Sequence, residues 1–354
     1  MNLSGMPEPA IPFAPLSYIC KRAPGKLELD GRLDKKFWAD APWTEDFVDI
    51  EGDLKRKPWK RTRVKMLWDD EYFYFGAELE EDEIWATLTE RESVIFYDND
   101  FEIFIDPDGD THQYYEFEIN ALNTVWDLML VTPYRDGGPP INGWDIRGLR
   151  TAVHIDGKLN DPGADNRSWS VEVAMPWNIL RECAEGQKPP QAGQYWRVNF
   201  SRVQWQVEKE DGAYRKKINP ETGRPYPEDN WVWSPQGVIN MHYPEMWGFV
   251  QFAGDEMSGG AEPSFELPDD EYVKWKLRRL YYRQRNHYER FGEFAAELAP
   301  LLEDGDEGGE LAAWGSSEQT PLIETTTNSF RIRAVSADGS GAYWIREDGK
   351  LWKE

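Results

Sequence analysis

The stretch DNDFEIFIDPDGD, Asp98 to Asp110, decides the fold of this chain together with YYEFEIN, Tyr114 to Asn120, which follows it. Successive side chains of a β-strand point to opposite faces. In the first stretch Phe101, Ile103 and Ile105 share one face, and the apolar residues of the second stretch alternate in the same way. Two adjacent strands with one apolar face each predict a paired β-structure that seals a hydrophobic core.

The opposite face of this strand pair is polar. It carries Glu102 from the first strand, and Glu116, Glu118 and Asn120 from the second. The aromatic residues that we expect beside it are Tyr97, Trp126 and Trp144. Carboxylates accept strong hydrogen bonds from hydroxyl groups, and aromatic rings offer an apolar stacking surface. This combination suits a polyhydroxylated ring such as a sugar, whereas a solvated outer sheet face is the plain structural alternative.

The rest of the first 254 residues repeats the β-pattern. Arg63 to Leu79 contains two aromatic, β-prone runs around Asp69–Glu71 and predicts a hairpin. Trp169 to Leu180 predicts a strand that enters a short helix, and WGFVQF, 247–252, is the last strand. Many short strands with little helix predict an all-β fold, an antiparallel β-sandwich.

Composition changes along the chain and predicts four segments. Val273, Leu277 and Leu280 begin a helical apolar pattern, so we expect a helix from Asp269 to Leu302. The last residues contain Asp-Gly turns and predict a small hairpin. The expected segments are an extended N-terminal segment, 1–25; the sandwich, 26–254; a linker and a helix docked on the sandwich, 255–302; and an acidic linker with the terminal hairpin, 303–354.

The charge of the chain excludes some partners. The 65 acidic and 40 basic residues give a net charge of −25, which opposes binding to nucleic acid or to anionic membranes. The basic run KWKLRRLYYRQRNHYER lies in the predicted helix, where its cations can pair with acids across a docking contact. No apolar window is long enough to span a bilayer. The first 15 residues lack the basic start and apolar core of a signal peptide.

The two cysteines, Cys20 and Cys183, exclude a disulfide-rich scaffold. They could form one long-range bridge or act as two small buried hydrophobic residues. The sequence carries no signal for the oligomeric state.

Seven pieces of the sequence, in order, resemble carbohydrate-binding modules of family 9 and their DOMON-like relatives. The pieces are LDGRLDKKFWADAP, VKMLWDDEYFYFGAEL, DNDFEIFIDPDGD, YYEFEIN, WSVEVAMPW, WRVNFSRVQW and WGFVQF, within Leu27 to Phe252. The resemblance implies an immunoglobulin-like β-sandwich with structural calcium ions and a sugar held between two tryptophans. It also favours an extracellular or periplasmic location.

The resemblance assigns roles to some of the residues above. Glu102 matches a family glutamate, Asn120 matches the family's strand-ending asparagine, and Glu118 stands where the family has another polar residue. In place of the two tryptophans the chain has Tyr97, beside Phe96, and the segment 241–243. The sequence therefore departs from the family in its aromatic clamp.

Two further sites are expected. Arg135, in the loop after Trp126, could bind a carboxylate or uronate through two of its guanidinium nitrogens, or pair with Asp127 or Asp136. Asp106, Asp108 and Asp110 place oxygen ligands at alternate positions, as a calcium loop does, and the resemblance favours calcium there. An ordinary acidic turn is the alternative.

These observations favour non-catalytic recognition of a carbohydrate, either a chain end or a short oligosaccharide. Two alternatives remain open. One is a sugar hydrolase that uses Glu102 and Glu118, since glycosidases use a pair of acids. The other is a protein–protein assembly module whose aromatic face meets another chain.

Overall fold

Two β-layers form the body of the protein, and strand β1, Ser17–Arg22, joins them. The computed structural model describes residues 5–254, 264–302, 311, 314 and 320–354. The first layer contains, in spatial order, β8 (Pro140–Ile141), β7 (Val125–Leu130), β6 (Tyr114–Asn120), β5 (Asp100–Asp106), β11 (Tyr195–Gln204) and β15 (Gly248–Phe252). A branch adds β14 (Asp229–Val232), which pairs with β11, and β2 (Val48–Asp49), which pairs with β14. The second contains β3 (Thr62–Trp68), β4 (Tyr72–Glu80), β10 (Ser168–Pro176) and β9 (Arg150–Asp156).

Neighbouring strands in these layers pair antiparallel except at β1. Its first residues pair parallel with β15, and Lys21 and Arg22 pair parallel with β3. This strand lies within the segment 1–25 that the sequence predicts to be extended. The fold class, an all-β sandwich, is confirmed.

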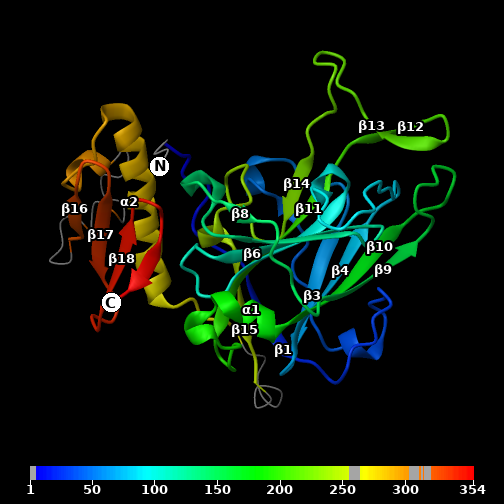
Figure 1. Ribbon diagram of the computed structural model, residues 1–354, viewed down its shortest axis with the longest axis horizontal. Coiled ribbons are helices and arrows are strands. Elements are labelled where there is room, and N and C mark those ends of the chain that lie inside the picture. The colour runs from blue at the N-terminus through cyan, green and yellow to red at the C-terminus, as the bar shows by residue number, and fades with distance from the viewer. Residues whose placement is uncertain (1–4, 255–263, 303–310, 312–313, 315–319) are drawn as a thin grey trace.

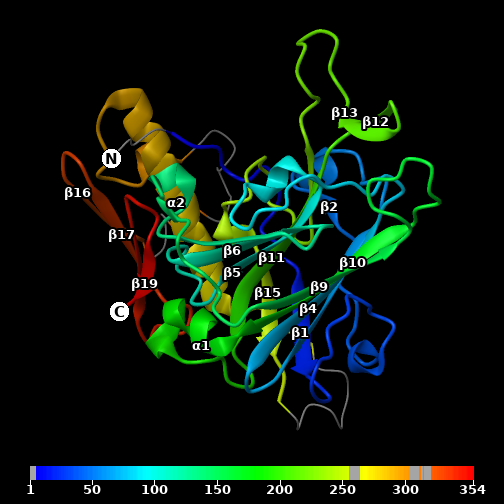
Figure 2. The same ribbon diagram turned by 45° about the vertical axis from the view of Figure 1, so that its right-hand side comes forward.

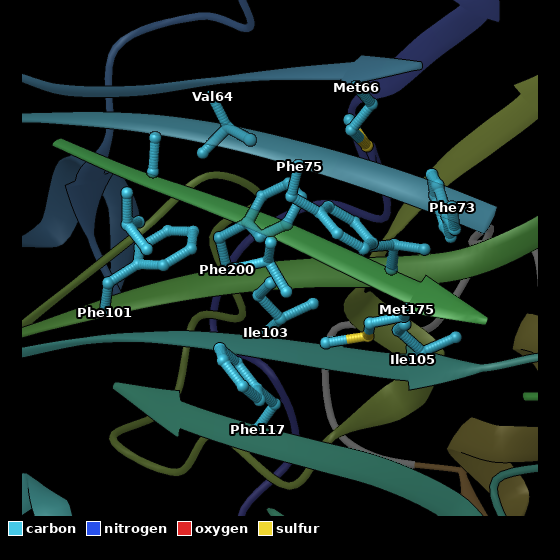
Figure 3. Close-up of a cluster of buried hydrophobic side chains, with 14 of the residues drawn as sticks. Val64, Met66, Phe73, Phe75, Phe101, Ile103, Ile105, Phe117, Met175 and Phe200 are labelled. Carbon is cyan, nitrogen blue, oxygen red and sulfur yellow. The ribbon is translucent and has the colours of Figure 1, made fainter. Parts of the chain in front are cut away.

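The core lies between the layers. Phe101, Ile103 and Ile105 of β5 point into it, as their alternation predicts, and they meet side chains of the opposite layer such as Phe75 and Met175 (Figure 3). All five are at most 1% exposed. This buried face fixes the register of β5, because a slip of one residue would turn its acids into the core.

Short helical turns connect the strands. They are α1 (Trp177–Leu180) and the 3-10 turns η1 (Lys36–Trp38), η2 (Gly52–Leu54), η3 (Ile95–Tyr97), η4 (Tyr134–Asp136), η5 (Arg181–Cys183), η6 (Glu185–Gln187), η7 (Pro244–Met246) and η9 (Ala299–Leu301). A separate hairpin of β12 (Val207–Glu210) and β13 (Ala213–Lys216) extends from the edge of the sandwich (Figure 1).

The long helix α2, Asp269–Phe291, lies between the sandwich and a small C-terminal sheet (Figures 1 and 2). It ends earlier than the predicted Leu302, because Gly292 caps it in the left-handed conformation with φ 74°. The expected terminal hairpin is part of a four-stranded antiparallel sheet, made of β16 (Leu322–Thr325), β17 (Phe330–Val335), β18 (Ala342–Arg346) and β19 (Leu351–Lys353). The linker residues 255–263 and most of the acidic linker 303–319 lie outside the described residues.

The basic run of α2 is used within the chain. Arg285 contacts Asp136 at 2.7 Å and Arg283 contacts Glu8 at 2.7 Å, and both arginines are buried. The arginines therefore hold the helix to the sandwich and to the N-terminal segment, as the docking interpretation predicts.

Two smaller expectations can be compared with the structure. Cys20 and Cys183 are both free thiols, so the long-range bridge does not form. Among the described residues, no helix combines the length and the apolar composition that crossing a lipid bilayer requires.

Candidate functional site

One row of side chains runs across four strands on the outer face of the first layer. Ser201 of β11 lies opposite Glu102 of β5, Glu102 opposite Glu118 of β6, and Glu118 opposite Trp126 of β7. Directly opposite residues on one face of a sheet have their Cβ atoms about 5 Å apart. Asp100 and Glu116 lie one pleat away on the same face. We call Asp100, Glu102, Glu116 and Glu118 the acid cluster.

The acid cluster is buried, which corrects the expectation of an open polar face. Asp100 is 0%, Glu102 5%, Glu116 6% and Glu118 1% exposed. The turn η3 helps to cover it: the Phe96 amide donates a hydrogen bond to Glu118 Oε2 at 3.0 Å. The indole of Trp205 donates to the Phe96 carbonyl at 2.8 Å and holds the turn in place. Tertiary packing over the sheet, rather than strand alternation, therefore sets the exposure of these acids.

No basic side chain neutralises the acid cluster. Within the described part of the chain, no lysine or arginine nitrogen lies within 4.0 Å of its carboxylates. Burial raises the pKa of Glu102 to about 7, and it raises the pKa of Asp100, Glu116 and Glu118 well above the ordinary range. Asp100 Oδ2, Glu116 Oε2 and the Ser201 hydroxyl are buried without a hydrogen-bond partner. The cluster is thus a group of buried carboxyls whose ionisation is disfavoured and whose hydrogen bonds are incomplete.

Two exposed tyrosines lie near the acid cluster, and we call them the tyrosine rim. Tyr97 is 56% exposed and belongs to η3, next to the residue that binds Glu118. Tyr134 is 45% exposed. Its ring packs on His242, whose ring packs on Phe104, and Phe104 lies opposite Glu116 in the sheet. Burial raises the pKa of Tyr134 to about 12, with further contributions from the charges of Glu116 and Glu118.

The ring of Tyr134 is supported from behind by His242. Their rings meet edge to face with centroids 4.5 Å apart. The Tyr114 hydroxyl lies 2.8 Å from His242 Nδ1, and burial together with the charge of Arg135 lowers the pKa of His242 to about 3. The imidazole is therefore neutral, and one hydrogen bond joins its Nδ1 to the Tyr114 hydroxyl. The segment 241–243, where the family places its second tryptophan, thus supports a rim residue.

Three of the predicted sugar-binding residues make contacts within the protein instead of offering free groups at this site. They are Asn120, Arg135 and Trp144. Asn120 Nδ2 donates to the Leu88 carbonyl at 2.9 Å, and its Oδ1 accepts from the Thr124 amide at 3.0 Å. This amide shapes the turn after β6 instead of facing a ligand.

Arg135 is engaged internally. Its side chain is 5% exposed and pairs with Glu245 at 2.9 Å and, more loosely, with Asp136 at 3.4 Å. The sequence left two roles open for Arg135, ligand binding or an internal ion pair. The structure shows internal ion pairs, and Asp136 is one of the partners.

Trp144 lies on the other face of the sheet. Its ring stacks on Tyr115 with centroids 4.7 Å apart, and Tyr115 belongs to the hydrophobic core. Trp126 by contrast lies beside Glu118, partly buried in a small outer apolar cluster with Phe104 and Tyr114. Of the predicted sugar-binding residues, the structure brings together Tyr97, Glu102, Glu118 and Trp126.

The predicted calcium loop also forms a cluster. Asp106, Asp108 and Asp110 each offer a carboxylate oxygen within 4.8 Å of the other two. Several of these oxygens accept backbone hydrogen bonds: both oxygens of Asp106 bind amides of the turn at 3.0 Å. Lys350 lies 3.3 Å from Asp110. Burial and the neighbouring Asp110 charge raise the pKa of Asp108 to about 7.

Two residues near the acid cluster, Tyr134 and Ser201, were not predicted from the sequence. Ser201 alternates in phase with the buried polar Asn199, so the strand pattern contained a signal for its face. Tyr134 lies in a loop without periodicity, and no sequence pattern links it to Glu116 and Glu118.

Residues 29–192 match the model of the family described as carbohydrate family 9 binding domain-like. The resemblance stated from the sequence is therefore confirmed for this part of the chain. No curated protein matches the chain significantly.

Solved structures with a similar fold include two bacterial examples. One is a Bacteroides uniformis protein to which carbohydrate binding has been ascribed, with 13% identity, a TM-score of 0.47, and coverage of 68% of this chain and all of the other. The other is a family 9 module from Caldicellulosiruptor kristjanssonii in complex with cellotriose, with 16% identity, a TM-score of 0.42, and coverage of 71% of this chain and all of the other.

Proposed function

We propose that this protein recognises carbohydrate without catalysis, and that the tyrosine rim above the acid cluster is the contact surface. The match over residues 29–192 supports carbohydrate as the ligand class. The single observation that carries the proposed site is the exposure of two tyrosine rings, Tyr97 and Tyr134, on turns that pack over the sheet face of the acid cluster. A pyranose ring offers C–H groups to the faces of the two tyrosine rings and hydroxyl groups to their phenol oxygens.

Catalysis by Glu102 and Glu118 is disfavoured by the same geometry. The acids of a retaining glycosidase are about 5 Å apart and flank an accessible bond. Here a third acid, Asp100, offers an oxygen within 4.8 Å of both, and all three are nearly inaccessible. Recognition by the exposed rim requires no such access.

The ligand that we infer is a short oligosaccharide or a chain end. Two separate side chains, rather than a long aromatic platform, suit one or two sugar rings. Each ring that is buried by stacking contributes about 1–2 kcal/mol, so millimolar to high micromolar affinity is expected. Free oligosaccharides should bind better than the same oligosaccharides with chemically reduced ends if a chain end is recognised.

The experiment is a glycan screen followed by calorimetry with Tyr97→Ala and Tyr134→Ala. Each variant should bind the selected glycan about tenfold more weakly. Tyr272→Ala is the matched control, because this tyrosine of α2 is 43% exposed and is not part of the rim. Unchanged affinity in both rim variants, or no binding to any glycan at millimolar concentration, would contradict the proposal.

We also propose calcium as a structural ion at Asp106, Asp108 and Asp110, with an extracellular or periplasmic location for the protein. The clustering of three carboxylates on one turn supports the ion site. Calcium should raise the melting temperature of the protein, and Asp108→Asn should reduce that increase. An identical increase in the variant would contradict this site.

A further inference from the structure

We propose that the acid cluster binds a divalent cation through Asp100, Glu102 and Glu118, with the Ser201 hydroxyl as an additional oxygen. This site is separate from the Asp106–Asp110 loop, and it does not depend on the proposed function. It lies in the sheet itself, on β5, β6 and β11, beneath the turn η3.

The distances fit a cation of the size of calcium. One oxygen from each of the three acids lies within 4.8 Å of the others. Two ligands on opposite sides of Ca²⁺ are about 4.6–5.2 Å apart, because each Ca–O distance is about 2.3–2.6 Å. Mg²⁺, with distances of about 2.1 Å, requires a tighter set and retains several waters. Because the three carboxylates are buried, an ion that gives up its waters readily is preferred, which favours Ca²⁺ over Mg²⁺.

The second observation is the lack of partners among the buried groups. The Ser201 hydroxyl is 0% exposed, lies directly opposite Glu102 and has no hydrogen-bond partner. Asp100 Oδ2 is equally buried and unpartnered. Buried polar groups are normally hydrogen-bonded, so an unpaired hydroxyl and an unpaired Asp100 oxygen among three buried acids indicate a missing ligand with positive charge.

The Asp106–Asp110 loop differs in this respect. Both oxygens of Asp106 accept backbone amides, and Lys350 already supplies a positive charge to Asp110. In the acid cluster, the backbone amides supply single bonds, from Phe96 to Glu118 and from Val203 to Asp100. The sheet site therefore has buried oxygen atoms without a partner, whereas, among the described residues of the loop, no carboxylate oxygen is left buried and unpaired.

The site also has a mechanical connection to the rim. Glu118 binds the amide of Phe96, and Tyr97 is the next residue of η3. A cation that fixes the Glu118 carboxylate fixes this hydrogen bond as well. Cation binding should thus order the turn that presents Tyr97.

The test is calorimetric titration of the full chain, stripped of metal with EDTA, first with CaCl₂ and then separately with MgCl₂, in the absence of sugar. The variants are Glu102→Gln and Glu118→Gln, which preserve side-chain volume. Glu90→Gln is the control for a charge change, since this glutamate is exposed and outside the cluster. Asp108→Asn distinguishes the loop from the sheet site.

Wild type, Glu90→Gln and Asp108→Asn should share a calcium-binding event that is at least about tenfold weaker in Glu102→Gln and Glu118→Gln. Folding is checked independently, because both glutamine variants should melt at a higher temperature than wild type without metal and gain less from calcium. The proposal is overturned if both glutamine variants bind calcium as wild type does, or if the wild type binds neither metal up to millimolar concentration. Because no sugar is present, that failure leaves the carbohydrate proposal standing.

Discussion

His242, which packs behind Tyr134, makes the free energy of unfolding of the protein dependent on pH. The direction and size of this dependence follow from the surroundings of the imidazole. The imidazole is neutral in the folded protein, with a pKa lowered to about 3 by burial and by Arg135. In the unfolded chain its pKa is about 6.5. As pH falls below about 6.5, the unfolded chain takes up a proton that the folded chain refuses. Stability is therefore complete above this pH and is lost as the pH falls toward 3.

The magnitude follows from the same values. Between pH 6.5 and about pH 5 the difference amounts to at most about 2 kcal/mol, at about 1.4 kcal/mol per pH unit. The residue is partly exposed, which allows solvent to relieve part of the penalty. We therefore expect His242 to lose about 1 kcal/mol of stabilisation at about pH 5.

The assay compares wild type with His242→Asn, whose side-chain amide can hydrogen-bond the Tyr114 hydroxyl in place of Nδ1. Urea unfolding at about pH 7.5 and about pH 5 gives the free-energy difference between the two proteins. Wild type should lose about 1 kcal/mol relative to the variant on acidification. His154→Asn, on β9, controls for the loss of an imidazole elsewhere. A difference that is independent of pH, or one that favours wild type at low pH, would refute this reasoning.

Two further substitutions test the packing that positions the site. Arg285→Ala should lower the free energy of unfolding by about 3 kcal/mol, because it leaves the buried Asp136 without its closest cation, whereas the exposed Arg290→Ala on the same helix should change it little. Gly31→Ala should lower the melting temperature strongly, because φ is +80° and the new Cβ would lie 2.3 Å from the His154 amide nitrogen. Gly212→Ala has a similar φ of +78° but no atom within 4 Å of its Cβ, so equal effects of the two glycine substitutions would argue against the steric clash.

The sequence predicted the core side of the site because local alternation determines it. Phe101, Ile103 and Ile105 lie in the core, and Glu102 and Glu118 are cross-strand neighbours, as their register requires. The burial of these acids could not be predicted in the same way. It depends on Trp205 holding η3 over the sheet, a contact between residues more than one hundred positions apart.

The same limit applies to residues outside the strands. The loop after β7 was a reasonable place for a ligand-binding arginine, yet Arg135 faces Glu245. Its neighbour Tyr134 reaches the rim instead. A loop sequence has no periodic pattern that predicts which side chains point inward. Their directions are set by the helix and turns that pack on the loop.

The cation site and the tyrosine rim should be thermodynamically linked through Glu118. Its carboxylate is shared between the proposed cation and the Phe96 amide, and η3 continues directly into Tyr97. If calcium raises the affinity for a glycan by some factor, the glycan must raise the affinity for calcium by the same factor.

Calorimetric titrations in both orders measure the two factors independently. Tyr97→Ala should reduce both factors together while leaving calcium binding without sugar intact. Glycan affinity that is indifferent to calcium in a protein that binds both would show that the turn is already rigid, and it would remove the mechanical argument that connects the buried acids to recognition.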